Sequence, residues 1–341
     1  MTTRLSLLIV MALLTVPSRA KSQPLDARAA AAYASREEWW VMNADGCSNY
    51  VAEFGKGPPV VVVHGGFGAE HGYLVDAFAG LSSRYKLVFY DQRGSLRSPY
   101  KVYEKGGSNA CPDSLITLAN HVSDLENLRI QLGVEKMTLV AHSMGTFVAL
   151  SYLQKFPGRV SGLVLISPGV PLKSDHSPAL VARQKAAGNS LFERPEIAAE
   201  TRKAGLDHPN LSDRERIEAW RIRFASANIY DLRKWRRLGG GMAFYNSRAG
   251  SAASQTMPKE WNFVELLEKR ACPTAVIVGD HDIGDMGARM ISEDVRSVSG
   301  VRLTVIPDAG HVVWIDQPSA FGVALARGLQ LCAEAAVNRL N

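Results

Sequence analysis

The 341-residue sequence predicts an α/β fold, with a mainly parallel central sheet flanked by helices and one inserted helical cap. Continuous apolar runs such as Val60–Val63 are typical of strands buried on both faces, as in parallel sheets. These runs alternate with segments that are apolar at helical spacing, which indicates strand–helix–strand units. The composition, 46% hydrophobic and 21% charged, excludes the disordered and fibrous classes.

The first 20 residues have the pattern of a secretory signal peptide. Arg4 precedes an apolar run from Leu5 to Val16, and Ala20 ends a small-residue cleavage site. Because the run is short for a membrane span and no second run follows, we expect cleavage after Ala20, a secreted or periplasmic protein and no stable membrane insertion. An uncleaved anchor is the alternative. Residues 21–36 then form an alanine-rich leader, which we expect to be mobile or helical.

The core is predicted to comprise residues 37–171 and 261–341. It begins with an antiparallel hairpin and continues with alternating strands and helices. The expected strands are 38–43, 47–54, 60–63, 86–90, 137–141, 160–167, 273–278 and 302–306, and the expected helices are 70–82, 120–132, 146–156 and 318–339.

Residues 172–260 are predicted to form the helical cap, because the apolar runs stop there and 213–224 has helical periodicity. The segment holds 16 Lys and Arg against 10 Asp and Glu, which favours an anionic substrate. The alternative is that these charges belong to solvated helix faces. An aminopeptidase would instead need acidic groups for the substrate's amine, and the candidates are Glu193, Glu196, Glu200, Glu215 and Glu218.

The segment Met137–Gly145, MTLVAHSMG, predicts a strand, a sharp turn and a helix with Ser143 at the turn. Such a nucleophile elbow raises a serine hydroxyl above the sheet. Ala141 stands where the usual pattern has a glycine, so the pentapeptide alone is also compatible with an ordinary strand-to-helix turn.

Motifs that follow other predicted strands strengthen the hypothesis of a nucleophile. HGGFG, DQRG, GDHD and AGH each come directly after a strand, as the serine elbow does. The carboxyl ends of parallel strands meet at one edge of a sheet, where ligands bind. We therefore expect these loops to form one site.

A serine nucleophile needs a base, and the base needs a carboxylate that orients it. We predict His311 as the base, because it follows the last strand in a small-residue loop, and Asp282 as the carboxylate after the preceding strand. Asp280 is the alternative acid. His281 and His142 flank these positions, and a structural role is the simpler interpretation of both.

The oxyanion that forms on attack needs fixed N–H donors. We expect one donor from the backbone of Met144 and the other from Gly66 or its neighbour Phe67. Phe67, His142 and Trp314 are the side chains predicted to contact the substrate.

With these motifs, the sequence resembles the α/β-hydrolase superfamily, and within it the proline iminopeptidases and related hydrolases. HGGFG is similar to that group's HGGPG, DQRGSLRS to its DQRGSGRS, and Asp124–Gly133 to its D-x-E-x-L-R-x-x-L-G helix. GDHD and GH-x-x-W also match. The resemblance implies a catalytic triad of Ser143, Asp282 and His311, with Gly66 and Met144 in the oxyanion hole.

Two departures separate the sequence from the peptidases. Their elbow usually reads GGSWG, whereas AHSMG is closer to esterases and carbon–carbon hydrolases, and Phe67 replaces the peptidase proline. We therefore expect an exported serine hydrolase of an ester or amide bond, with a proline iminopeptidase-like enzyme, a carboxylesterase and a carbon–carbon hydrolase as candidates. A ligand-binding protein without turnover is an alternative of another class. Epoxide hydrolases and dehalogenases of this superfamily carry a carboxylate at the elbow and are disfavoured.

No metal or other cofactor is expected, since no Cys or His residues cluster at ligand spacing. The net charge of +6 is too small and scattered to indicate nucleic acid binding, so the expected partner is a small-molecule or short peptide substrate. Four cysteines in an oxidising compartment can form disulfides. Placement on the predicted sheet favours Cys272 with Cys332 at its lower edge, which leaves Cys47 with Cys111.

Overall fold

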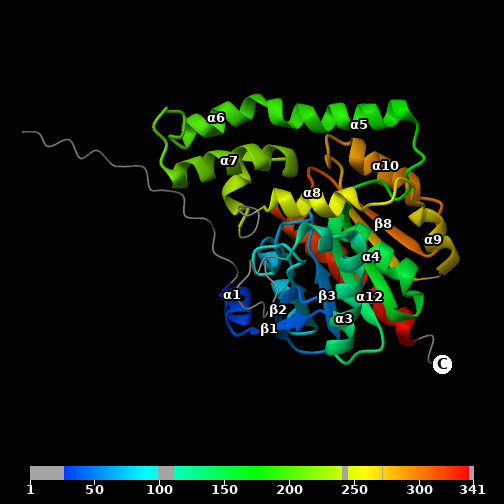
Figure 1. Cartoon of the computed structure of the whole chain (residues 1–341). Coiled ribbons are helices and arrows are strands. Elements are labelled where there is room, and N and C mark those ends of the chain that lie inside the picture. The colour runs from blue at the N-terminus through cyan, green and yellow to red at the C-terminus, as the bar shows by residue number, and fades with distance from the viewer. Residues whose placement is uncertain (1–26, 99–110, 240–244, 271, 338–341) are drawn as a thin grey trace, which may run out of the picture.

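The computed structural model describes residues 27–98, 111–239, 245–270 and 272–337, so the predicted signal peptide lies outside the described residues. A central sheet has helices packed on both faces (Figure 1). Its strands are β1 (Glu37–Met42), β2 (Ser48–Gly55), β3 (Pro59–Val63), β4 (Lys86–Tyr90), β5 (Met137–Ser143), β6 (Val160–Pro168), β7 (Thr274–Gly279) and β8 (Val301–Ile306). They are ordered β1-β2-β4-β3-β5-β6-β7-β8. From β4 to β8 all neighbouring strands are parallel, whereas β1 pairs with β2, and β2 with β4, in the antiparallel direction. The predicted fold class is therefore confirmed.

Successive residues of the central strands face two separate apolar layers. In β3, Val61 and Val63 pack in the layer that contains Phe147, whereas Val60 and Val62 pack in the layer that contains Phe321. Helices α3 (Leu118–Gln131) and α4 (Met144–Lys155) contribute to the first layer, and α12 (Pro318–Val337) covers β6, β7 and β8 on the second. Burial on both faces explains why these strands are continuous apolar runs.

Residues 70–82 do not form the single continuous helix that was predicted. The chain there makes a 3₁₀ turn (His71–Leu74), the short helix α2 (Val75–Phe78) and a second 3₁₀ turn (Ala79–Leu81). Gly72 and Gly80 lower helix propensity in this stretch, which favours several short turns. The structure also contains α9 (Phe263–Arg270), α10 (Met286–Val295) and the short α11 (Val313–Asp316), which the sequence pattern did not predict. Helix α1 (Ala27–Ala34) lies in the alanine-rich leader, for which a helix was one of the two expectations.

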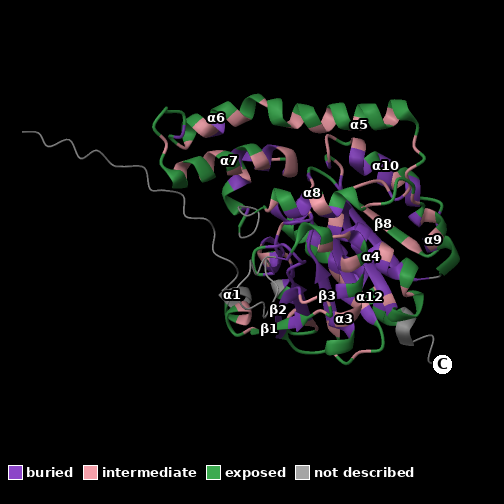
Figure 2. Cartoon of the chain, viewed as in Figure 1, coloured by how far each residue is buried: buried purple, intermediate pink, exposed green. Residues whose placement is uncertain are grey.

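Helices fill the segment between β6 and β7, over the edge of the sheet where the parallel strands end (Figure 1). They are α5 (Pro178–Ser190), α6 (Pro195–Lys203), α7 (Asp213–Asn228) and α8 (Ser247–Gln255), and α9 follows them before β7. Helix α7 begins with a capping box between Ser212 and Glu215, which satisfies free N–H groups at its first turn. Helix α5 has no buried residue, and Figure 2 shows its largely exposed surface. No described helix is long and apolar enough to cross a membrane.

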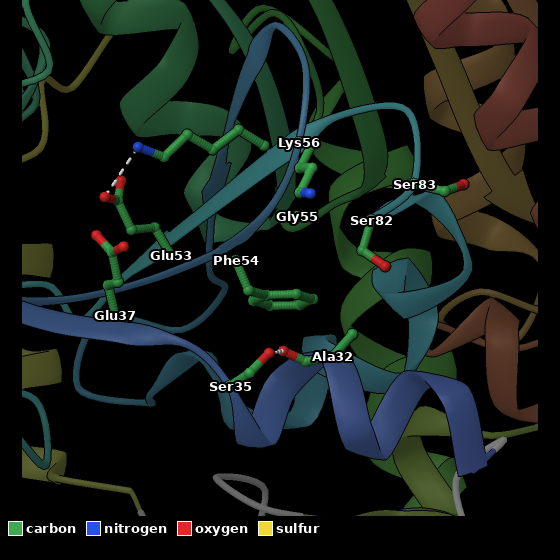
Figure 3. Close-up of a pocket in the computed structure, with 10 residues that line it drawn as sticks. Ala32, Ser35, Glu37, Glu53, Phe54, Gly55, Lys56, Ser82 and Ser83 are labelled. Carbon is green, nitrogen blue, oxygen red and sulfur yellow. Dashed lines mark hydrogen bonds and ion pairs between the residues drawn. The ribbon is translucent and has the colours of Figure 1, made fainter.

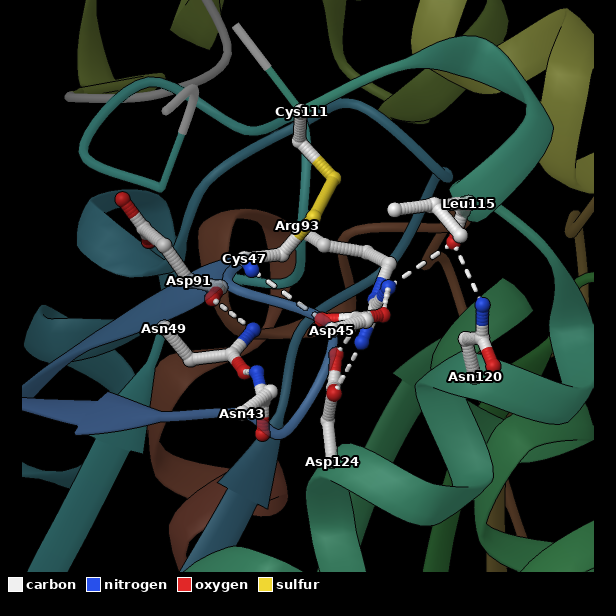
Figure 4. Close-up of a disulfide and its surroundings, with 10 residues drawn as sticks. All are labelled: Asn43, Asp45, Cys47, Asn49, Asp91, Arg93, Cys111, Leu115, Asn120 and Asp124. Atoms are coloured by element: carbon white, nitrogen blue, oxygen red, sulfur yellow. Dashed lines mark hydrogen bonds and ion pairs between the residues drawn. A yellow bond between two sulfur atoms is a disulfide. The ribbon is translucent and has the colours of Figure 1, made fainter. Parts of the chain in front are cut away.

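Arg93 of the DQRG motif joins separate parts of the core (Figure 4). Its side chain is 2% exposed, and its guanidinium donates to both carboxylate oxygens of Asp124 on α3, with Nε 2.7 Å from Oδ2. It also lies 2.7 Å from Asp45 in the β1–β2 turn and donates to the carbonyl of Leu115. The motif therefore has a structural role, because its cation holds the hairpin, this loop and α3 together.

A disulfide reinforces the same region. Cys47, just before β2, is bonded to Cys111, with Cα atoms 5.6 Å apart (Figure 4). The bond links the hairpin to the segment that leads into α3. The expected pairing of Cys47 with Cys111 is therefore confirmed.

The expected disulfide between Cys272 and Cys332 is wrong, since both residues are buried thiols in the structure. The two residues are neighbours as predicted, and the sulfur of each lies 3.9 Å from the carbonyl oxygen of Pro273. Cys332 also donates to the carbonyl of Leu163. Burial, assisted by Cys272, raises the pKa of the Cys332 thiol to about 12, which disfavours the thiolate that disulfide formation needs.

Replacing Arg93 with Leu should lower the free energy of unfolding by about 3–5 kcal/mol, because Asp124 would remain as a buried charge without its cation. Urea unfolding followed by circular dichroism measures this change. Lys269→Ala is the matched control, since it breaks an exposed pair with Glu265 that is worth about 0.3–0.5 kcal/mol. Equal losses in the two variants would contradict the structural role of Arg93.

Candidate active site

Ser143 lies in a strained turn between β5 and α4. Its backbone φ of 54° and ψ of −127° are unusual for a residue with a side chain. The turn depends on glycines nearby: a β-carbon on Gly145 would lie 2.5 Å from the carbonyl oxygen of Val63, and one on Gly169 would lie 2.8 Å from the nitrogen of Met144. The strand, turn and helix therefore form the predicted elbow, and its serine is partly exposed.

The predicted triad residues lie within hydrogen-bond distance of one another. His311 Nε2 is 2.8 Å from Ser143 Oγ, and His311 Nδ1 is 2.8 Å from Asp282 Oδ1. Ser143 ends β5, whereas Asp282 and His311 follow β7 and β8, and Asp282 is 2% exposed. A neutral His311 with its proton on Nδ1 can donate to Asp282 and accept the proton of Ser143.

The electrostatics of His311 suit a general base. Burial alone would lower its pKa, but the charge of Asp282 and the hydrogen bond to it outweigh burial, so the pKa lies above the ordinary value of 6.5. The alternative acid, Asp280, has other contacts: its Oδ1 lies 2.6 Å from His281 Nδ1 and accepts from the N–H of Ala309. The geometry favours Asp282 as the partner of His311.

The glycine loop after β3 lies against the elbow. A β-carbon on Gly65 would lie only 2.7 Å from Cβ of Ser143, so a larger residue cannot fit. The N–H of Gly65 already donates to Tyr73 Oη at 2.7 Å, which leaves Gly66 and Phe67 as candidate oxyanion donors on this side. Met144, the first residue of α4, supplies the candidate on the other side. The oxyanion role of Gly66 and Met144 remains a prediction.

The three side chains predicted to contact substrate are all buried. Phe67 is 2% exposed and stacks on His121, with ring centroids 5.3 Å apart. His142 is 3% exposed and Trp314 is 5% exposed, and their rings pack together with a centroid distance of 5.0 Å. The contact of these three side chains with substrate remains a prediction.

Residues of the predicted cap contact three of the loops that carry the site. The N–H of Asn246 donates to the carbonyl of Gly68 in the glycine loop, and the N–H of Val312, next to His311, donates to the carbonyl of Asn228. Helix α5 approaches the loop after Asp282, where a β-carbon on Gly188 would lie 3.3 Å from Ile283. The predicted cap therefore lies against the loops that follow β3, β7 and β8.

Asp316 is an important residue that the sequence pattern did not reveal. Its buried carboxylate accepts from the N–H groups of Tyr230 at 2.7 Å and Asp231 at 3.1 Å in the cap, and from Gly310 at 3.0 Å beside His311. Lys234 Nζ donates to its backbone carbonyl. One carboxylate therefore connects the cap to the loop that carries the base.

The described residues also include a polar cluster and a hollow to which no triad residue belongs. Glu70, His71 and Asp91 are close enough to hold a metal ion, but His71 Nδ1 is 2.6 Å from Asp91 Oδ1 and Glu70 accepts from the N–H of Gly72, so they already satisfy one another and the backbone. A hollow of about 560 Å³ lies beside α1, and its lining includes Glu53, Phe54 and Lys86. Figure 3 shows Glu53 and Phe54 among the residues that line it. It lies where β3 and β4 begin, at the edge opposite the triad.

Comparison with known proteins identifies the family. Residues 58–318 match the family described as alpha/beta hydrolase fold. The chain belongs to this family. A human (lyso)-N-acylphosphatidylethanolamine lipase is 29% identical over 280 residues, which cover 78% of each chain. A human 1-acylglycerol-3-phosphate O-acyltransferase, ABHD5, is 27% identical and covers 77% of this chain and 75% of its own.

A solved structure agrees with this assignment. The proline iminopeptidase-related protein of Thermus thermophilus is 27% identical, has a TM-score of 0.62 and covers 88% of this chain and 99% of its own. The α/β-hydrolase resemblance of the sequence motifs is therefore confirmed, and the chain is a member of a hydrolase family.

Activity should rise with pH through an apparent pKa above 6.5, because His311 must be neutral to accept a proton and Asp282 favours its charged form. Asp282→Asn should keep the fold, lower kcat on the order of 10³-fold or more, and move the inflection to lower pH. Rates with p-nitrophenyl butyrate between pH 5 and 9 measure both. A larger loss of kcat in Asp280→Asn than in Asp282→Asn would assign Asp280 as the carboxylate partner of His311.

Asp316→Ala should lower the free energy of unfolding by about 1–3 kcal/mol, since three backbone N–H donors, of which that of Gly310 is buried, would lose their acceptor. It should also lower kcat, because the His311 loop loses support. Thermal unfolding and the same ester assay measure the two effects. Asp175→Ala, at an exposed position in the cap, is the control. Unchanged stability in Asp316→Ala would contradict the assigned contacts.

Proposed function

We propose that the protein is a serine hydrolase that cleaves carboxylic esters through an acyl-enzyme on Ser143. The observation that carries the proposal is the pair of 2.8 Å contacts that place His311 between Ser143 and Asp282. A serine hydroxyl is a weak nucleophile by itself, and this arrangement supplies the base that activates it.

The reaction follows from the positions of the atoms. Ser143 Oγ attacks the ester carbonyl while His311 Nε2 takes its proton, and Asp282 stabilises the charged ring. The N–H groups of Met144 and Gly66 bind the oxyanion in this proposal. His311 then gives the proton to the leaving alcohol, and a water molecule activated by the same base releases the acid.

The cap glutamates favour an ester over a peptide with a free amine. Glu215 caps α7, and Glu200 is buried with an oxygen 3.5 Å from Lys203. Glu218 lies 3.6 Å from Arg214, and Glu196 lies 3.7 Å from Arg194. Existing cations and caps therefore engage most of the carboxylates that could hold an amine. The lipase among the relatives also supports an acyl ester substrate.

We also propose that the mature protein is exported. The signal-peptide pattern of residues 1–20 supports this, and so does the Cys47–Cys111 disulfide, since such bonds persist in oxidising compartments.

A fluorophosphonate probe should label Ser143 in the wild-type chain and fail to label Ser143→Ala. Peptide mass spectrometry locates the modification, and circular dichroism verifies that both proteins are folded. Absence of labelling in the folded wild type would reject the proposed nucleophile and favour a ligand-binding protein.

The substrate class follows from a panel of acyl p-nitrophenyl esters, aminoacyl anilides and carboxylate-bearing β-diketones. We expect turnover of the esters with little or none of the anilides. Faster cleavage of anilides would establish an aminopeptidase, and cleavage of the diketones alone would establish a carbon–carbon hydrolase.

A further inference from the structure

A buried chain of hydrogen bonds runs behind Ser143, from the glycine loop to the loop of His311. The N–H of Gly65 donates to Tyr73 Oη at 2.7 Å, and Tyr73 Oη lies 2.7 Å from His142 Nδ1. At the other end of the ring, His142 Nε2 lies 3.2 Å from the carbonyl oxygen of His311. Tyr73 is 6% exposed and His142 is 3% exposed, so water competes little for these contacts.

The donors and acceptors of this chain allow one arrangement. A backbone carbonyl accepts only, so His142 must carry a proton on Nε2 to contact His311. Neutral His142 then has an acceptor at Nδ1, and the Tyr73 hydroxyl donates to it while accepting from Gly65. Burial, with the nearby charge of His311, holds the pKa of His142 well below 6.5, which keeps the ring neutral.

Hydrogen bonds of this buried chain and of the neighbouring side chains fix the peptide groups next to the candidate oxyanion donor Gly66. In the peptide between His64 and Gly65, Gln92 Nε2 donates to the carbonyl at 2.7 Å, and the N–H donates to Tyr73. In the next peptide, His64 Nδ1 donates to the carbonyl of Gly65 at 2.9 Å. Because C=O and N–H point in opposite directions in a trans peptide, this contact turns the N–H of Gly66 away from His64.

We propose that Tyr73 and His142 are positioning residues that fix the spacing between the oxyanion loop and the loop of the base on either side of Ser143. This inference rests on the proposed function. The packing supports it, since Trp314 lies against both rings, with centroids 6.1 Å from Tyr73 and 5.0 Å from His142. A β-carbon on Gly65 would lie 2.8 Å from Tyr73 Oη and 3.0 Å from His142 Nδ1, which shows how closely the chain abuts the loop.

Tyr73→Phe tests the proposal because it removes one oxygen atom and leaves the N–H of Gly65 without its acceptor. We expect kcat for p-nitrophenyl butyrate to fall about tenfold with KM within about threefold, since the displaced donor acts mainly in the transition state. The pH inflection should stay at its wild-type position, because the contact between His311 and Asp282 is intact. Tyr152→Phe is the matched control, as it removes a buried hydroxyl that donates to Glu126 at 2.6 Å away from the site.

His142→Asn provides an independent variant, because the shorter amide can accept from Tyr73 but cannot reach the carbonyl of His311. We expect a similar fall in kcat. Since both residues belong to one chain, the double variant Tyr73→Phe/His142→Asn should be no slower than the slower single variant, within about twofold. Circular dichroism at the assay temperature verifies that each variant is folded.

The outcomes separate this inference from the proposed function. If wild-type protein turns over the ester and kcat of Tyr73→Phe equals that of Tyr152→Phe, the positioning role is overturned and the hydrolase remains. Multiplicative losses in the double variant would likewise overturn the linked chain. If folded wild-type protein neither turns over the ester nor reacts with fluorophosphonate, the proposed function and the inference built on it both fail.

Discussion

The strained turn at Ser143 is the constraint on which the site depends. With φ at 54°, the serine stands between β5 and α4 in a conformation that costs of order 1–3 kcal/mol for a residue with a side chain. Close packing maintains it: Gly65, Gly145 and Gly169 bring three backbone segments to distances that a β-carbon would prevent. The central sheet, buried on both faces, supplies the rigidity that holds these segments in place.

The loops around this turn are joined to one another as well as to the sheet. Asp316 connects the His311 loop to the cap, and Tyr73 and His142 connect it to the glycine loop. Arg93 joins the hairpin to α3 further from the site. A displacement of residues 230 and 231 would therefore reach the loop of His311 through the backbone hydrogen bonds to Asp316.

The sequence predicted what local pattern and strand order determine. The strands could be placed from their continuous apolar runs. The elbow at Ser143 and the loops of Asp282 and His311 could be placed together because parallel strands bring their carboxyl ends to one edge. Contacts between distant side chains could not be read in this way. Asp316 and Tyr73 have no local signature, the exposure of Phe67 and Trp314 depends on packing, and the choice between cysteine pairs depends on the position of the hairpin.

The central claim is that Ser143 carries the acyl group during turnover. Rapid mixing of the protein with p-nitrophenyl acetate, followed by acid quenching and peptide mass spectrometry, tests it most directly. The structure predicts a burst of nitrophenol of one equivalent per folded chain and an acetyl group on the peptide that contains Ser143. Steady turnover with no modified peptide, or acetylation at another residue, would contradict the account.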